Sequence, residues 1–106
     1  MQADGVMYFT IPIELNGMDL KTVGAHVYTA SSGNAVDVDI YNFTDGNTMM
    51  TTRITIDNGE TDSCTAAVAA VIDPNEDDVV TCDVIRIDIK DKGTDATGLE
   101  VRLAFG

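Results

Sequence analysis

The sequence has little of several residue types on which protein functions commonly depend. It contains no Trp, one His, two Cys, three Tyr and three Phe in 106 residues. Its core must therefore be built from Val, Ile, Leu, Ala and Met. Residues 1–5 have neither a basic nor an apolar region, so we expect no signal peptide. No apolar run approaches the ~18 residues that a membrane span requires.

Positive charge is also scarce. Six Lys and Arg residues stand against 18 Asp and Glu residues, which gives a formal net charge of −12. Nucleic-acid binding depends on basic side chains that neutralise phosphates, and anionic membrane surfaces attract basic segments. We therefore expect neither a nucleic acid nor a membrane as partner. A strongly acidic surface does keep a protein soluble at high local concentration, which suits a component displayed in many copies.

The two cysteines, Cys64 and Cys82, are 18 residues apart and form no CxxC pair. This spacing is not that of a zinc site. We interpret them as two small, partly buried apolar side chains, with a single disulfide as the alternative.

An alternation of apolar and polar residues runs through much of the chain. It is clearest at residues 36–41, 85–90 and 99–105. Such alternation predicts strands with one buried face, as in antiparallel sheets. Less regular runs at residues 7–13, 18–30 and 49–56 complete the set. Pro12 indicates a sheet edge or a strand end, and Gly24 indicates a bulge or bend.

Turn-forming residues separate these runs, at 16–17, 31–34, 45–47, 57–59 and 92–95. Strands and turns that recur every ~8–12 residues are typical of a sandwich or barrel. The Ala-rich segment 63–71 is too short for a persuasive helix, so we expect a loop with at most one turn or short strands. Residues 1–106 are thus expected to form one all-β domain, an antiparallel β-sandwich of about eight strands, with residues 1–5 as a flexible arm.

Catalytic residues are hard to find in this sequence. Nucleophilic catalysis usually needs a His beside the nucleophile, and the one histidine, His26, lies in a strand on the face opposite Ala25 and Val27. We interpret it as a surface or interface residue. Asp37 and Asp39 would lie about 7 Å apart on one strand face, but a glycosidase pair also needs a cleft with aromatic sugar platforms. We expect a solvated acidic face and no enzyme, with a small hydrolase as the weakest alternative.

One loop has partial calcium-binding character. Asp73, Asn75 and Asp77 match the first half of a calcium-binding loop, in which alternate oxygens converge on one cation. The sixth position is Asp78 where Gly is needed, and the twelfth is Val84 where a Glu is needed. We interpret the segment as an acidic turn, with a cation site at the first three residues as the alternative. No cofactor is expected.

Four short runs stand out from the rest: T-I-D-N-G-E at 55–60, D-P-N-E-D-D-V at 73–79, T-C-D-V-I-R-I-D at 81–88 and G-L-E-V-R-L at 98–103. Together they resemble small jelly-roll-like virion proteins of tailed bacteriophages, in which a T-G-D-x-[IL]-R-[IVF]-D unit leads into the last hairpin. Cys82 stands here in place of the turn glycine, so a positive φ is not expected at that position.

The resemblance implies a non-enzymatic virion structural protein with a jelly-roll-like fold, above all a capsid decoration (cement) protein. Head fibres and tail-fibre parts belong to the same group. The implied partners are further copies of the chain, usually as a trimer, and the major capsid protein or other virion subunits. The implied location is the virion, after assembly in the host cytoplasm.

Apolar, aromatic and histidine side chains on the outward faces are the candidate interface residues: Val6, Tyr8, His26, Tyr28, Tyr41 and Phe43. The alternative function is a carbohydrate- or receptor-binding module of a phage tail or fibre, assisted by Ca²⁺. Such modules bind sugars through exposed aromatic rings, and a chain without Trp fits them less well.

Overall fold

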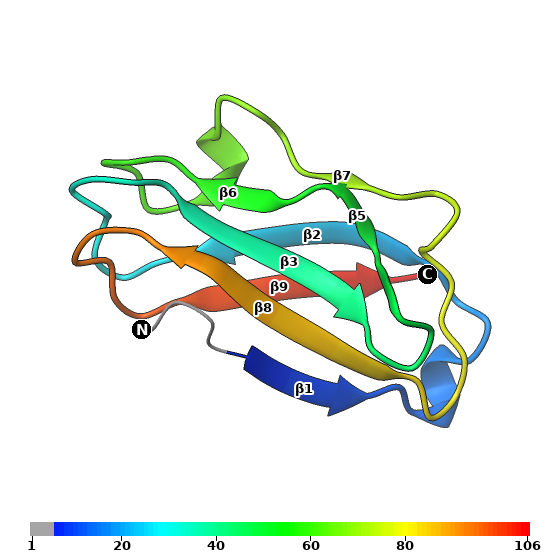
Figure 1. Cartoon of the computed structure of the whole chain (residues 1–106). Coiled ribbons are helices and arrows are strands. Elements are labelled where there is room, and N and C mark those ends of the chain that lie inside the picture. The colour runs from blue at the N-terminus through cyan, green and yellow to red at the C-terminus, as the bar shows by residue number, and fades with distance from the viewer. Residues whose placement is uncertain (1–5) are drawn as a thin grey trace.

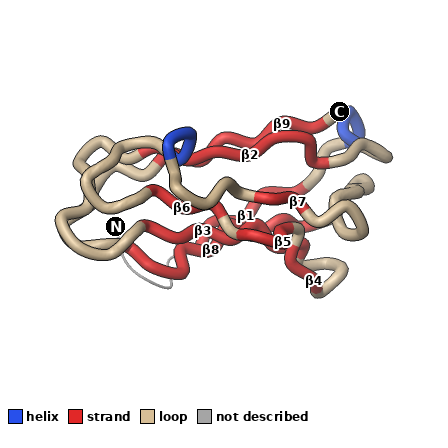
Figure 2. Tube along the Cα trace, turned by 90° about the horizontal axis from the view of Figure 1, so that it is seen from above, coloured by secondary structure: helices blue, strands red, loops and turns tan. Residues whose placement is uncertain are grey.

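The computed structural model describes residues 6–106, which form nine strands in two main layers (Figures 1 and 2). The strands are β1 (Val6–Thr10), β2 (Leu20–His26), β3 (Val36–Asn42), β4 (Asn47–Thr48), β5 (Met50–Thr52), β6 (Ile54–Ile56), β7 (Val71–Ile72), β8 (Val84–Lys92) and β9 (Glu100–Phe105). Two 3₁₀ turns, η1 (Ile13–Leu15) and η2 (Ser63–Thr65), lie between them. Within the described residues, no helix is long and apolar enough to cross a membrane.

The larger layer is an antiparallel sheet with the strand order β1-β8-β3-β4, in which β6 also pairs with β3. The other layer is the β2-β9 pair, which lies above β3 and β8 in Figure 2. The two-stranded β5-β7 ladder flanks them. The predicted antiparallel β-sandwich is therefore confirmed, and the jelly-roll strand order stays a prediction. The proposed arm, residues 1–5, lies outside the described residues.

The core lies between the layers, where the apolar positions of the alternation meet. On β3, Val36, Val38 and Ile40 are all fully buried. They face Leu20 and Ala25 of the opposite layer within one continuous cluster of buried residues. Each such aliphatic side chain larger than Ala contributes about 1.5–3 kcal/mol when it leaves water. The period-2 pattern thus predicted the core correctly.

Gly24 was expected to mark a bulge or bend, and the bulge is wrong. It pairs in regular register with Arg102 of β9, and the register shift in this ladder lies between Leu20 and Thr22. A Cβ at position 24 would lie 2.6 Å from Nη2 of Arg102. A side chain at position 24 would therefore displace the Arg102 guanidinium, which crosses directly over the strand.

The predicted turns are confirmed at four glycines with positive φ: Gly17, Gly46, Gly59 and Gly93. Cys82 also has a positive φ, of 75°, contrary to expectation. Backbone hydrogen bonds hold this turn closed, because the Cys82 N–H donates to the Ile11 carbonyl at 2.9 Å and the Asp83 N–H donates to the Val80 carbonyl at 3.0 Å. Tertiary pairing with the segment after β1 therefore imposes a conformation that the side chain disfavours.

Both cysteines are exposed and free. The interpretation of partly buried side chains and the alternative of a disulfide are both wrong. The Ala-rich segment forms the single turn η2 and then continues without regular structure as far as β7, as expected.

Candidate interaction surface

Four side chains converge on the outer face of the larger sheet. We call this set, Tyr8, Tyr41, Phe43 and Arg86, the Arg86 cluster. Arg86 on β8 lies opposite Tyr8 on β1 and opposite Tyr41 on β3. Its guanidinium carbon lies 4.4 Å from the centroid of the Tyr41 ring and 5.5 Å from that of Phe43. Tyr8 and Phe43 meet edge to face, with centroids 6.0 Å apart. The cation and the three rings thus fix one another's positions.

The cluster is open to solvent although its members contact one another. Tyr8 is 55% exposed and Phe43 is 52% exposed, and Val6 beside them is 49% exposed. Tyr41 is half-buried beneath Arg86. Four of the six predicted interface residues, Val6, Tyr8, Tyr41 and Phe43, are therefore brought to one face. Arg86 was missed, because its place between two tyrosines depends on strand register.

A buried polar network holds the end of β3, directly before the turn that carries Phe43. Asn42 is 2% exposed, and its Nδ2 donates to carboxylate oxygens of Asp45 and Asp83, each at 3.3 Å. Its Oδ1 accepts a hydrogen bond from the Asp45 N–H at 3.1 Å. The Phe43 N–H donates to the Val84 carbonyl at 2.8 Å. The turn that carries the exposed ring is thus held by hydrogen bonds to Asp45, Asp83 and Val84.

Carboxylates lie along the same face, beside the cluster. Asp39 and Asp88 face each other across β3 and β8 and are 7% and 5% exposed. The expected solvated acidic face is therefore wrong for Asp39, because the neighbouring strands and their side chains cover it. Nε of Arg86 lies 2.8 Å from Oδ1 of Asp88, and Nζ of Lys90 lies 3.7 Å from Oδ2. Two cations thus offset the buried negative charge.

Asp37 extends the row of carboxylates and is half-buried. Burial raises its pKa, and the nearby Asp39 and Asp91 raise it further, while Arg53, whose Nη1 is 3.0 Å away, opposes them. For Arg86, burial works against the charged form, but the adjacent Asp88 carboxylate outweighs it and raises the pKa. Arg86 therefore stays cationic at every working pH.

The other two predicted interface residues lie in the other layer. His26 is half-buried on β2, opposite Glu100 of β9 and in a bridge with Asp62. Tyr28 lies beyond the end of β2, is 84% exposed, and its N–H donates to the Thr97 carbonyl at 2.8 Å. These residues do not join the Arg86 cluster.

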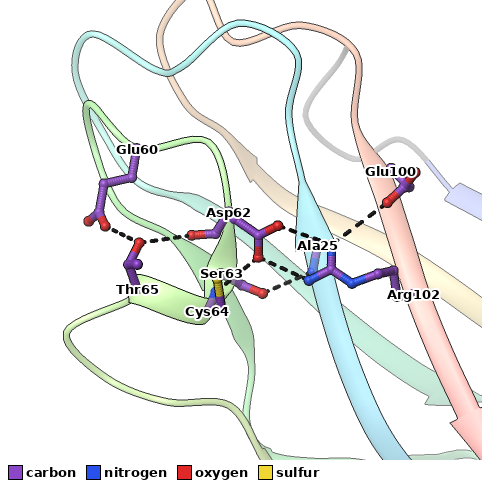
Figure 3. Close-up of polar contacts among 8 residues, drawn as sticks. All are labelled: Ala25, Glu60, Asp62, Ser63, Cys64, Thr65, Glu100 and Arg102. Atoms are coloured by element: carbon purple, nitrogen blue, oxygen red, sulfur yellow. Dashed lines mark hydrogen bonds and ion pairs between the residues drawn. The ribbon is translucent and has the colours of Figure 1, made fainter.

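A second arginine organises this other layer (Figure 3). Nη1 and Nη2 of Arg102 lie 3.1 and 2.9 Å from the two carboxylate oxygens of Asp62. Asp62 also accepts from the Cys64 N–H at 3.0 Å, and Ser63 Oγ accepts from the Ala25 N–H at 2.9 Å. We call this set, Gly24, Asp62, Ser63 and Arg102, the Arg102 clip, because it fastens the η2 loop onto β2 and β9.

The electrostatics of the clip are those of a structural ion pair. The hydrogen bonds from Arg102 and from the Cys64 N–H hold the pKa of Asp62 well below its usual range. The hydrogen bond to Asp62 in turn raises the pKa of the Cys64 thiol. A raised thiol pKa disfavours the thiolate, which is the nucleophilic form. The clip therefore closes a loop and does not activate Cys64.

The acidic loop is organised by its own backbone. The Asp73 carboxylate accepts from the Asn75 N–H at 2.9 Å, and the Asp77 carbonyl accepts from the Leu20 N–H at 2.8 Å. Within the described residues, no group of three or more His, Cys, Asp and Glu side chains is placed to hold a metal ion. The cation site at Asp73, Asn75 and Asp77 stays a prediction.

Comparisons with protein-family models, with curated proteins and with solved structures found no match for this chain.

Proposed function

We propose that this chain is a non-enzymatic structural protein of a bacteriophage virion that binds neighbouring subunits through the Arg86 cluster. The proposed role is that of a capsid decoration protein, as the resemblance of residues 55–60, 73–79, 81–88 and 98–103 implies. The partner is a capsid protein or another virion subunit.

The observation that carries the proposal is the exposure, on a sheet face, of an arginine-aromatic cluster whose members contact one another. Tyr and Arg are the residue types that contribute most to binding energy at protein interfaces. Phe43 and Tyr8 are about half exposed, although each can bury a large apolar area in a contact. Because Arg86 already fixes the rings, their ordering costs little entropy on binding.

The charge of the chain supports the same role. With a net charge of −12, copies crowded on one particle repel one another over most of their surfaces. At the Arg86 cluster three rings are exposed or half-buried around a cation, and the nearest carboxylate, Asp88, is buried and paired with that cation. The exposed part of this face is therefore less acidic than the rest of the surface, and acidic surfaces elsewhere disfavour non-specific association.

The test is mass spectrometry of purified virions together with a binding assay. We expect the protein in the particle at a fixed, high copy number relative to the major capsid protein. Phage capsids (heads) that lack the protein are the binding partner in this assay. Phe43→Ala is expected to lower the affinity for these heads at least tenfold. Val68→Ala is the matched control, because Val68 is 62% exposed and belongs to the loop beyond η2.

Absence of the protein from virions would contradict the proposal, as would undiminished head binding by Phe43→Ala. Specific binding on a glycan array, lost on Phe43→Ala, would favour the carbohydrate-binding alternative instead.

A further inference from the structure

Strand β1 leaves one edge of the larger sheet open. Among residues 6–106 its strand partner is β8, and Figure 1 shows no described element on its other side. An open edge presents unpaired N–H and C=O groups that another strand can bind. Other margins of the fold carry features that discourage pairing, because β9 contains Glu100 and Arg102, and β4 and β7 are each two residues long.

The five residues of β1, V-M-Y-F-T, contain no charge and no proline. Val6, Met7 and Tyr8 are each about half exposed (49%, 50% and 55%), so both faces of the strand are accessible. Charges, proline and bulges are the usual protection of an edge strand. β1 lacks the first two, and its register with β8 runs without a shift.

The backbone direction at this edge follows from the neighbouring ladders. The Phe43 N–H donates to the Val84 carbonyl, which points toward β3, and the Ile11 N–H donates to the Asp83 carbonyl. Because bonding direction alternates along a strand, Ile85 and Ile87 of β8 point toward β1. Their partners, Phe9 and Met7, bond to β8. The N–H and C=O groups that point to the open edge therefore belong to Val6, Tyr8 and Thr10.

We infer that a second copy of the chain pairs with this edge, β1 against β1 in antiparallel orientation about a two-fold axis at Tyr8. In this register Tyr8 faces Tyr8 of the second copy, and Val6 faces its Thr10. All three outward-pointing residues then form hydrogen-bonded pairs, which gives about six hydrogen bonds across the edge. In the same register Met7 lies opposite Phe9 of the second copy, so both side chains stay on the inner face of the joined sheet.

Charge favours a second copy as the occupant. Each copy carries a net charge of −12, so contact between most surfaces brings carboxylates together. β1 is an uncharged strip, and an isologous contact places that strip against itself. The pairing also joins the Arg86 clusters of the two copies into one surface, because in each copy Tyr8 belongs both to the cluster and to the paired edge. The inference goes beyond the proposed function, whose partner is a capsid protein or another virion subunit. It gives a two-fold dimer in place of the trimer that the resemblance implies, and it can be tested on the purified protein alone.

Sedimentation equilibrium tests the pairing. We expect the wild-type protein to have twice the 11.3 kDa mass of the chain. Thr10→Pro removes one N–H that points to the open edge and none that bonds to β8, so it is expected to sediment as a monomer. Thr10→Ala keeps the N–H and is expected to stay a dimer. Circular dichroism and thermal unfolding establish that each variant is folded.

A second variant covers the case in which Thr10→Pro does not fold. Tyr8→Glu places two carboxylates opposite each other at the two-fold axis and is also expected to be monomeric. A wild-type monomer, a wild-type trimer, or a dimer that survives the edge variants would overturn the inference. Phe43→Ala removes a side-chain contact of Tyr8 but none of the N–H and C=O groups of β1, and it is expected to stay dimeric while losing head binding. A dimer that binds no heads would retain this inference and reject the proposed function.

Discussion

The two layers each place an arginine on an outer face, and the two arginines do different work. Arg86 lies between aromatic rings, beside a carboxylate that is 5% exposed. Arg102 crosses a glycine and binds a carboxylate that is 25% exposed with both terminal nitrogens. Arg86 holds the exposed aromatic rings of its cluster in contact, and Arg102 fastens the η2 loop to β2 and β9. Both residues are arginines, so their different roles come from the residues that strand register places beside each of them.

The largest expected effect separates the two arginines by stability. Arg86→Ala leaves the buried Asp88 opposite Asp39 with Lys90 as its remaining cation, so we expect a loss of about 2–3 kcal/mol in the free energy of unfolding. Arg102→Ala breaks an exposed pair, and we expect about 1 kcal/mol. Urea denaturation measures both.

The control for Arg86→Ala is the double variant with Asp88→Asn. Removing the unpaired charge is expected to recover most of the loss. Equal losses for the two single arginine variants, or no recovery in the double variant, would contradict the distinction between the layers.

Gly24→Ala is the next largest perturbation, and it acts on the clip alone. The new Cβ would lie 2.6 Å from Nη2 of Arg102, so the guanidinium must move away from Asp62. We expect a loss of about 1 kcal/mol. In an Arg102→Ala background the same substitution should cost almost nothing, because no side chain remains to be displaced. Additive losses in this double-mutant cycle would show that Gly24 serves another purpose.

Asp62→Asn tests the clip by pH. The pKa of Asp62 is lowered on folding, so its ionised form contributes stability above the unfolded pKa of about 3.9, and that stability is lost as the pH falls through the folded pKa. We expect Asp62→Asn to lower Tm by a few degrees at pH 7, with a smaller difference below about pH 4. The same variant should speed alkylation of Cys64, whose thiol pKa Asp62 raises, and Cys82 is the internal reference.

Asp37→Asn is expected to have the smallest effect and the opposite sign. The pKa of Asp37 is raised on folding. The protonated carboxyl therefore contributes stability that is fully present below about pH 3.9 and is lost as the pH rises through the folded pKa. Neutralising it should therefore raise Tm slightly at pH 7 and leave Tm unchanged at pH 3. A lower Tm at pH 7 would mean that the ion pair with Arg53 outweighs burial among the other carboxylates.

The alternation of apolar residues predicted the fold because one face of each strand is buried. Val36, Val38 and Ile40 were assigned to the core by parity alone and are fully buried. Parity also placed Tyr8, Tyr41 and Phe43 on outward faces. It could not show that Arg86 lies among them, because that depends on which strands are neighbours and in what register.

The errors have the same physical origin. Asp39 was expected in water but is buried, because Asp88 of the adjacent strand lies opposite it. Gly24 was interpreted as a bulge or bend from its own strand, whereas the structure places the Arg102 guanidinium directly over it. Cys82 adopts a positive φ because distant backbone pairs with its turn. Each error concerns a contact between residues far apart in the sequence.

The most direct test of the proposed function is hydroxyl-radical footprinting of the protein free and bound to heads. Tyr28, 84% exposed in the other layer, is the internal reference for Phe43 and Tyr8. We predict that binding strongly reduces the oxidation of Phe43 and Tyr8 and leaves that of Tyr28 unchanged. Protection of Tyr28 with unchanged oxidation of Phe43 would place the contact on the β2-β9 layer and contradict the account.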